Sequence, residues 1–230
     1  MNNWIKVARF HLADRISYTV LPWGVLGFDF LIWLLLAAAA GGGRSVQIPS
    51  GAILAIYVFF AIAGALSIFR SLPFAFALGI GRRSYYAGTT LLAIGLAAVY
   101  GLALSMLAVI ERVSGGWGAG LHFFRVAYIL AGPWYLDWLT SFVVLSLMFF
   151  YGMWFGLVYR RWNVLGLIAF VAGQILVLVI GAAIAGSDQA WPSIGRFFTT
   201  IGAAGLTGLL AVLAVLLLTG GYATMRRVTV

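Results

Sequence analysis

Residues 71–89 read SLPFAFALGIGRRSYYAGT and connect two long apolar runs of the chain. This connector contains one proline, three glycines, two adjacent arginines and two adjacent tyrosines. Because an arginine is costly at the centre of a bilayer, Arg82 and Arg83 predict that the connector lies at a membrane face. Pro73 is expected to bend or end the helix before it, and the glycines that follow are expected to permit a sharp turn. The stretch therefore predicts a rigid, basic turn at the membrane surface, suited to contact with another protein.

The composition of the whole chain is that of a membrane protein. Its 230 residues are 64% hydrophobic and only 8% charged, with a mean hydropathy of +1.09, whereas a soluble domain carries about 25% charged residues. The net charge is +9, but the basic residues are scattered between apolar runs. This pattern favours contact with anionic lipid headgroups over binding of nucleic acid. Cysteine is absent, which excludes disulfides and thiolate metal sites.

The apolar runs predict six membrane-spanning helices. Each is roughly 20 residues long, and a helix of that length covers a hydrocarbon core of about 30 Å. The connectors 111–134 and 186–202 are too apolar for freely solvated loops, so interfacial or re-entrant structure is expected there. The predicted spans are residues 18–40, 51–69, 87–110, 137–159, 164–185 and 203–222.

A short amphipathic helix is predicted before the first span. Trp4, Val7, Ala8 and Leu12 share one face at helical spacing, which is typical of a helix that lies in the membrane interface. We therefore expect an all-α membrane protein with a single transmembrane domain over residues 1–230. It would comprise an interfacial helix, a six-helix bundle and a cytoplasmic tail, at residues 1–16, 18–222 and 223–230.

The basic residues predict the orientation. With the N-terminus inside, ten of the fourteen basic residues fall on the inner side and four on the outer side. The positive-inside rule then places both termini in the cytoplasm. The inner ten are Lys6, Arg9, Arg15, Arg70, Arg82, Arg83, Arg160, Arg161, Arg226 and Arg227.

The sequence lacks the residues that most enzymatic sites require. Lys6 is the only lysine and lies outside any glycine-rich loop, so the chain has no P-loop for ATP hydrolysis. His11 and His122 are expected on opposite membrane faces, and a metal site would have to draw on five scattered carboxylates. We predict no catalytic residue, no metal ligand and no bound cofactor in this chain.

Four residues within the predicted spans are candidates for a substrate path. Asp29 lies near the middle of the first span, where a carboxylate usually points into the bundle and serves transport or proton coupling. The alternative is that Asp29 bonds a neighbouring polar group or stays protonated. Gln174 favours a structural hydrogen bond between helices, and Trp33 and Tyr57 suit an apolar path or ordinary packing.

The arginine pair has two interpretations as well. It is either a positive-inside anchor or part of a docking surface, and its neighbours favour docking. Ser84 is suited to cap the next helix, and the two tyrosines offer amphipathic contact surface of the kind enriched at interfaces. The predicted docking residues are Leu78, Gly79, Gly81, Arg82, Arg83, Ser84, Tyr85 and Tyr86.

With these features in view, the chain resembles the permease subunits of ATP-binding-cassette (ABC) transporters, in the small six-span exporter class of bacteria. The resemblance rests on the interfacial N-terminal helix, the six spans with both ends inside, and the segment PFAFALGIGRRSYYAGT between spans two and three. In that class this segment is the coupling helix, which fits a groove on the ATPase subunit. The long connector between spans three and four departs from the family pattern.

The resemblance implies a function for the chain and a set of partners. The chain would form the membrane-spanning part of an ATP-driven exporter in the cytoplasmic membrane, moving a hydrophobic or amphiphilic substrate. Two cytoplasmic ATPase subunits would bind ATP and Mg²⁺, and a second permease copy or a related permease would complete the path. Two alternatives are a proton-coupled secondary transporter that uses Asp29, and a non-transporting membrane partner such as an antibiotic-immunity protein.

Overall fold

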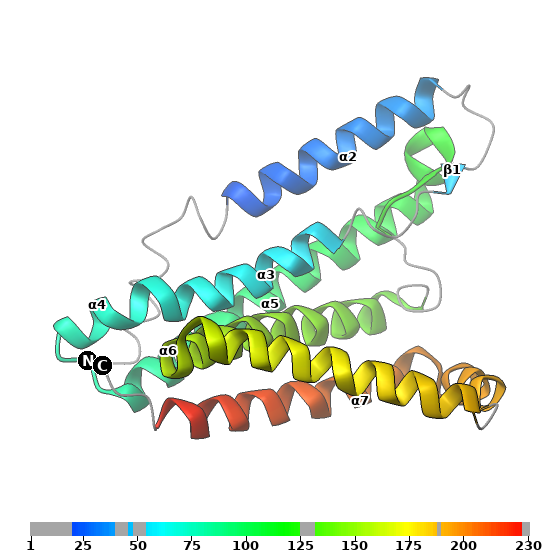
Figure 1. Ribbon diagram of the computed structural model, residues 1–230. Helices are drawn as coiled ribbons and strands as arrows, with labels where there is room; N and C mark the ends of the chain where they lie inside the picture. The colour runs from blue at the N-terminus through cyan, green and yellow to red at the C-terminus, as the bar shows by residue number, and fades with distance from the viewer. Residues whose placement is uncertain (1–19, 40–45, 48–53, 125–131, 188–189, 227–230) are drawn as a thin grey trace.

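A computed structural model describes residues 20–39, 46–47, 54–124, 132–187 and 190–226 (Figure 1). Within these ranges, five helical stretches are long and apolar enough to cross a membrane. The predicted helical class is thus confirmed, and the length and composition of these stretches suit membrane spans, while the predicted interfacial helix at residues 1–16 lies outside the described residues. The five stretches are α2 (Leu21–Ala39), the continuous run from α3 (Leu54–Leu66) to α4 (Leu72–Ala77), α5 (Arg82–Val113), α6 (Trp134–Ser187) and α7 (Trp191–Met225).

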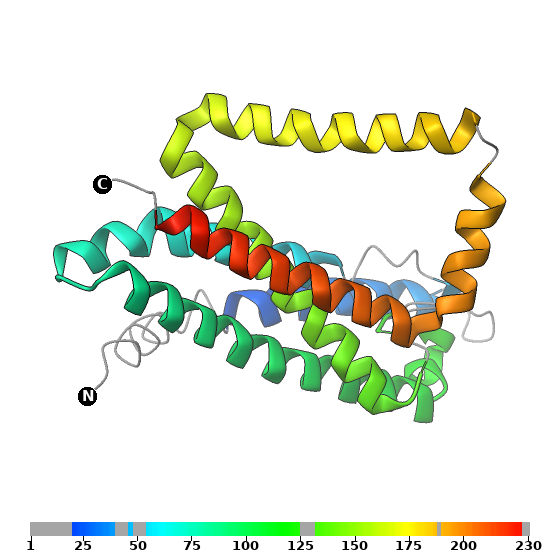
Figure 2. The same ribbon diagram turned by 90° about the horizontal axis from the view of Figure 1, so that it is seen from below.

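Two of the helices are bent into limbs. α6 is 54 residues long and bends at Asn163, whose φ of 54° and ψ of −156° are not helical. The segments predicted as spans 137–159 and 164–185 therefore correspond to two helical limbs that meet at the non-helical Asn163. α7 bends at Gly202, whose φ of 64° suits glycine. Figure 2 shows the second limb of α6 running apart from the other helices, with the first limb of α7 leading back to them.

The first limb of α6 lies at the centre of the bundle and packs against α3, α5 and α7. Its contact with α3 is so close that the two backbones touch. A Cβ added at Gly152 would lie 1.8 Å from the Ala61 carbonyl oxygen, and one at Gly64 would lie 2.1 Å from the Phe149 carbonyl oxygen. One turn beyond Gly152, a Cβ at Gly156 would lie 2.6 Å from the Ile68 Cβ. Glycine is therefore required along this helix crossing.

The helix α2 lies along one side of the bundle (Figure 1) and contacts it through buried aliphatic side chains and through aromatic rings. Trp23 stacks on Tyr100 of α5, with ring centroids 5.1 Å apart. Phe30 meets rings of the connector that follows α5, at 5.0 Å from Trp117 and 5.4 Å from Phe123. In that connector, the turn η3 (Gly116–Gly120), whose φ is positive at most positions, leads into β2 (Leu121–His122), which pairs in parallel with β1 (Val46–Gln47). The predicted all-α fold thus carries one minimal sheet.

The two ends of the bundle differ in charge. The α4–α5 turn, the α6 bend and the C-terminal end of α7 lie together at one end (Figure 1, left). The opposite end holds β1, η3, the start of α6 and the bend of α7. Of the described arginines, only Arg112 and Arg196 belong to elements of that opposite end, which also carries Glu111 and Asp137. The first end, called the basic end here, carries Arg70, Arg82, Arg83, Arg160, Arg161 and Arg226.

Candidate functional site

The turn between α4 and α5 is closed by backbone hydrogen bonds. Gly79 has a φ of 73°, and its N–H donates to the Phe76 carbonyl at 2.9 Å. The Ile80 N–H donates to the Ala75 carbonyl, also at 2.9 Å. These two bonds form a Schellman motif, in which a glycine of left-handed conformation ends the helix. The predicted sharp turn is confirmed, and its shape is fixed by the backbone itself.

Two details of the predicted turn are wrong, and a third is narrowed. Gly81 has φ −66° and ψ 149°, an extended conformation that does not require glycine. Ser84 does not cap a helix, because α5 already begins at Arg82 with Gly81 as a cap that makes no side-chain bond. Of the two outcomes predicted at Pro73, an end of the helix is not observed, since helical backbone continues through α4 to Ala77.

The region before Pro73 explains how the helix continues through this proline. The π-helical turn η2 (Ser67–Ser71) precedes α4, and Pro73 has no N–H to donate to the Phe69 carbonyl four residues earlier. That carbonyl instead accepts a hydrogen bond from Arg160 Nη2 at 2.9 Å. Arg160 therefore replaces the donor that the proline removes, and it ties the first limb of α6 to this helix.

The two tyrosines of the connector are buried, which corrects the prediction that they offer a contact surface. The Tyr85 hydroxyl donates to the Ser67 carbonyl in η2. The Tyr86 hydroxyl donates to the Leu218 carbonyl of α7 at 2.6 Å. Because α5 starts earlier than predicted, both side chains project from its first turn into the bundle. They hold the turn in place instead of presenting it to a partner.

The surface that the turn exposes is small and basic. Leu78 is 60% exposed, and Gly79 and Gly81 are exposed on either side of Ile80. Arg82 is exposed and donates to the Arg226 carbonyl at 3.2 Å. Arg83 is exposed, and the described part of the chain gives it no hydrogen-bond or ion-pair partner.

Comparisons with family models, curated protein sequences and solved structures find no match. The function must therefore be argued from the chemistry of this chain alone. Among the described residues, no group of three or more His, Cys, Asp or Glu side chains could hold a metal ion.

The structure does not gather the four predicted path residues into one site. Asp29 and Trp33 lie on α2, where Asp29 is partly exposed and has no hydrogen-bond or ion-pair partner in the described ranges. Tyr57 of α3 is buried and hydrogen-bonds Ser141 of α6. Gln174, on the second limb of α6, accepts a hydrogen bond from the Tyr151 hydroxyl at 2.6 Å. Tyr57 and Gln174 therefore join helices, and Asp29 keeps its polar atoms available.

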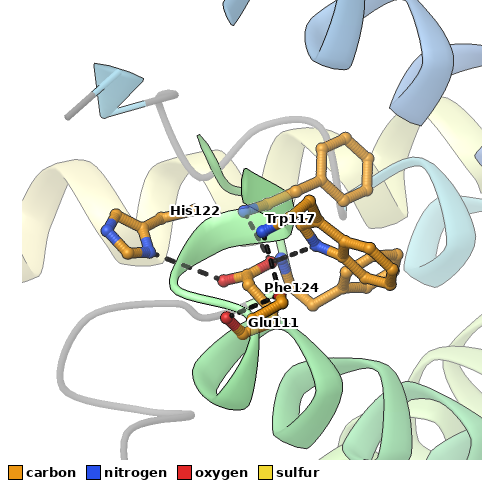
Figure 3. Close-up of polar contacts among 6 residues, drawn as sticks. Glu111, Trp117, His122 and Phe124 are labelled. Carbon is orange, nitrogen blue, oxygen red and sulfur yellow. Dashed lines mark hydrogen bonds and ion pairs between the residues drawn. The ribbon is translucent and has the colours of Figure 1, made fainter. Parts of the chain in front are cut away.

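A buried carboxylate that the sequence interpretation missed organises the connector after α5 (Figure 3). The Glu111 side chain is fully buried, and its Oε2 accepts the backbone N–H groups of Phe123 at 2.9 Å and Phe124 at 2.8 Å. Its Oε1 lies 3.8 Å from His122 Nδ1. The only signal in the sequence is an acidic residue beside an apolar connector in a chain with few acids.

A second buried carboxylate fixes the far side of the same connector. Asp137, in the first turn of α6, accepts the Gly132 N–H at 3.1 Å. Its other oxygen lies 3.5 Å from Arg112 Nη2, which also donates to the Gly132 carbonyl at 2.9 Å. The described residues on either side of positions 125–131 are thus each held by a carboxylate that is itself buried, Glu111 at Phe123 and Phe124 and Asp137 at Gly132.

Proposed function

We propose that this chain is the permease subunit of an ABC exporter and crosses the bacterial cytoplasmic membrane six times. The six crossings would be α2, the α3–α4 run, α5, each limb of α6 and the second limb of α7. The gathering of described arginines at the basic end supports a cytoplasmic position for that end. Both termini would then be cytoplasmic, because the chain enters α2 and leaves α7 on that side.

The observation that carries the proposal is the exposed basic turn at residues 78–83 and the buried bonds behind it. Leu78, Arg82 and Arg83 face outward, while Tyr85, Tyr86 and Arg160 bond the backbone of neighbouring helices. A partner that pushes on such a turn moves whole helices, because the turn cannot yield locally. This is what an ATPase subunit requires of its contact point on a permease.

The proposed complex contains two copies of a cytoplasmic ABC ATPase, which bind ATP and Mg²⁺, and a second permease copy or a related permease. ATP-driven closure of the ATPases would press on the turn and shift the spans as rigid bodies. The substrate would be hydrophobic or amphiphilic, because few polar side chains lie within the spans.

Co-purification from the native cell in mild detergent tests the proposal. We expect a nucleotide-binding subunit in stoichiometric amount with the wild-type chain, and its loss with the double variant Arg82→Glu, Arg83→Glu. Arg161→Glu is the matched control, because Arg161 also lies at the basic end but stacks on Trp162, 4.4 Å from the ring centroid. Recovery of the wild-type chain without any ATPase, or equal loss in the control, would contradict the proposed docking surface.

One observation favours a second candidate, a proton-coupled transporter. Asp29 has no described partner, and an unpaired carboxylate within a span is a standard element of proton pathways. Substrate export in inverted vesicles separates the two. ATP-dependent transport that resists a protonophore supports the permease, and transport that a proton gradient alone drives supports the alternative.

A further inference from the structure

A cavity of about 480 Å³ lies between α2 and α3. Its volume falls within the range of small-molecule sites, roughly 300–1,000 Å³. The residues that line it are all apolar, so by themselves they offer no means of selecting a ligand. They are Pro22, Val25, Leu54, Ala55, Ile56, Val58, Phe59 and Ile62.

Asp29 lies on the flank of α2 that borders this cavity. At 100° per residue, Pro22, Val25 and Asp29 share one flank of the helix, with Asp29 one turn beyond Val25. Trp23 and Phe30 lie on the adjoining face, which packs on the bundle together with the buried Leu26. Asp29 is not among the residues that line the cavity, but it continues their flank of α2 one turn further, where it is partly exposed and has no partner in the described part of the chain.

We propose that the cavity between α2 and α3 binds a lipophilic cation, with its apolar body between the two helices and its charge beside Asp29. An ionised carboxylate in a span is stabilised when a cation pairs with it. The Phe59 ring in the cavity wall adds a face on which a cation is attracted.

Other occupants fit the chemistry less well. An anionic amphiphile would be repelled by Asp29, and a neutral acyl chain would leave the carboxylate unpaired. A metal ion would need further ligands, and the described residues supply no cluster of them. A cation with an apolar body is the one ligand class that uses both the cavity and the acid.

The test is equilibrium binding of tetraphenylphosphonium to the purified full chain in a neutral detergent. We expect Asp29→Asn to weaken binding on the order of tenfold or more, because the pairing charge is lost at nearly unchanged shape. Asp29→Glu should retain binding, and Val25→Trp should abolish it by filling the cavity. Val171→Trp, an equal enlargement on the exposed second limb of α6, is the control and should leave the affinity unchanged. Equal affinity in the wild type and in Asp29→Asn, or in Val25→Trp, would overturn the proposal.

The identification of this cation as cargo rests on the proposed function, but its binding does not. The binding assay contains no ATPase and no ATP. Asp29-dependent binding without a co-purifying ATPase would support the cation site and contradict the proposed exporter. A co-purifying ATPase together with Asp29-independent binding would support the proposed exporter and contradict the cation site.

Discussion

The close contact of α3 with α6 at Gly152 predicts a large effect from a single methyl group. Gly152→Ala would place a Cβ 1.8 Å from the Ala61 carbonyl oxygen. Ordinary contact begins at about 3.4 Å, so α3 and α6 would have to move apart by about 1.5 Å. The neighbouring atom belongs to the backbone, and a change of rotamer cannot relieve the overlap. The substitution is therefore expected to loosen the central pair of helices along its length.

The expected magnitude follows from two opposing terms. Overpacking of this kind costs about 1–3 kcal/mol, and a backbone contact belongs at the upper end of that range. Replacing glycine by alanine within a helix returns about 1 kcal/mol through helix propensity. The net loss of about 2 kcal/mol corresponds to a fall in Tm of about 4–8 °C for a chain of this size. Thermal unfolding in detergent, followed by the loss of the monodisperse peak in size-exclusion chromatography, measures this shift.

The matched control is Gly173→Ala, on the second limb of α6. No atom lies within 4 Å of the Cβ that alanine would add there, so Tm should stay unchanged or rise slightly. Gly64→Ala should resemble Gly152→Ala, and the double variant should lose less than the sum, because one separation of α3 from α6 relieves both overlaps. A Gly152→Ala variant as stable as the control would refute the close crossing.

Two further predictions concern the buried polar contacts. Glu111→Ala removes the acceptor of two buried N–H groups. Each buried N–H left without an acceptor costs about 1–3 kcal/mol of stability. Residues 117–124 should therefore show faster hydrogen exchange, while residues 82–100 stay protected. A wild-type exchange pattern would contradict this role. Arg160→Met should lower Tm more than Arg161→Met, because Arg160 is the residue that donates a hydrogen bond to the Phe69 carbonyl. In a Pro73→Ala background, where an N–H becomes available to that carbonyl, the Arg160 effect should shrink, and an unchanged effect would refute the pairing.

Sequence patterns predicted the apolar helices and the turn well, because composition and glycine position are local signals. They failed for Tyr85 and Tyr86, because a tyrosine suits a buried contact and an interface equally well. The acceptor carbonyls lie 18 and 132 residues away in the chain, at Ser67 and Leu218, so no local pattern identifies them. Glu111 was missed for a related reason, since its partners are backbone N–H groups that any sequence offers.

The close crossing of α3 and α6 was within reach of the sequence. Gly152 and Gly156 form a G-x-x-x-G pattern within a predicted span, and this spacing allows helices to approach closely in a membrane. The partner helix was not predictable, because the matching glycine, Gly64, stands alone in its segment. Pairing of helices depends on the fit of two surfaces, of which the sequence shows only one at a time.

The contacts at the basic end also indicate where motion would arise if a partner pressed on the turn. Tyr85 and Arg160 bond the backbone of η2, and Tyr86 and Arg82 bond the backbone of α7. The α3–α4 run, α5, the first limb of α6 and α7 are thereby joined at that end and would move as one body. The helix α2 is attached through apolar contacts, among them those of Leu26 and of the Trp23 and Phe30 rings, which can slide on their neighbours more easily than hydrogen bonds can shift. A push on the turn would thus shift α3 relative to α2, and the cavity lies between these two helices.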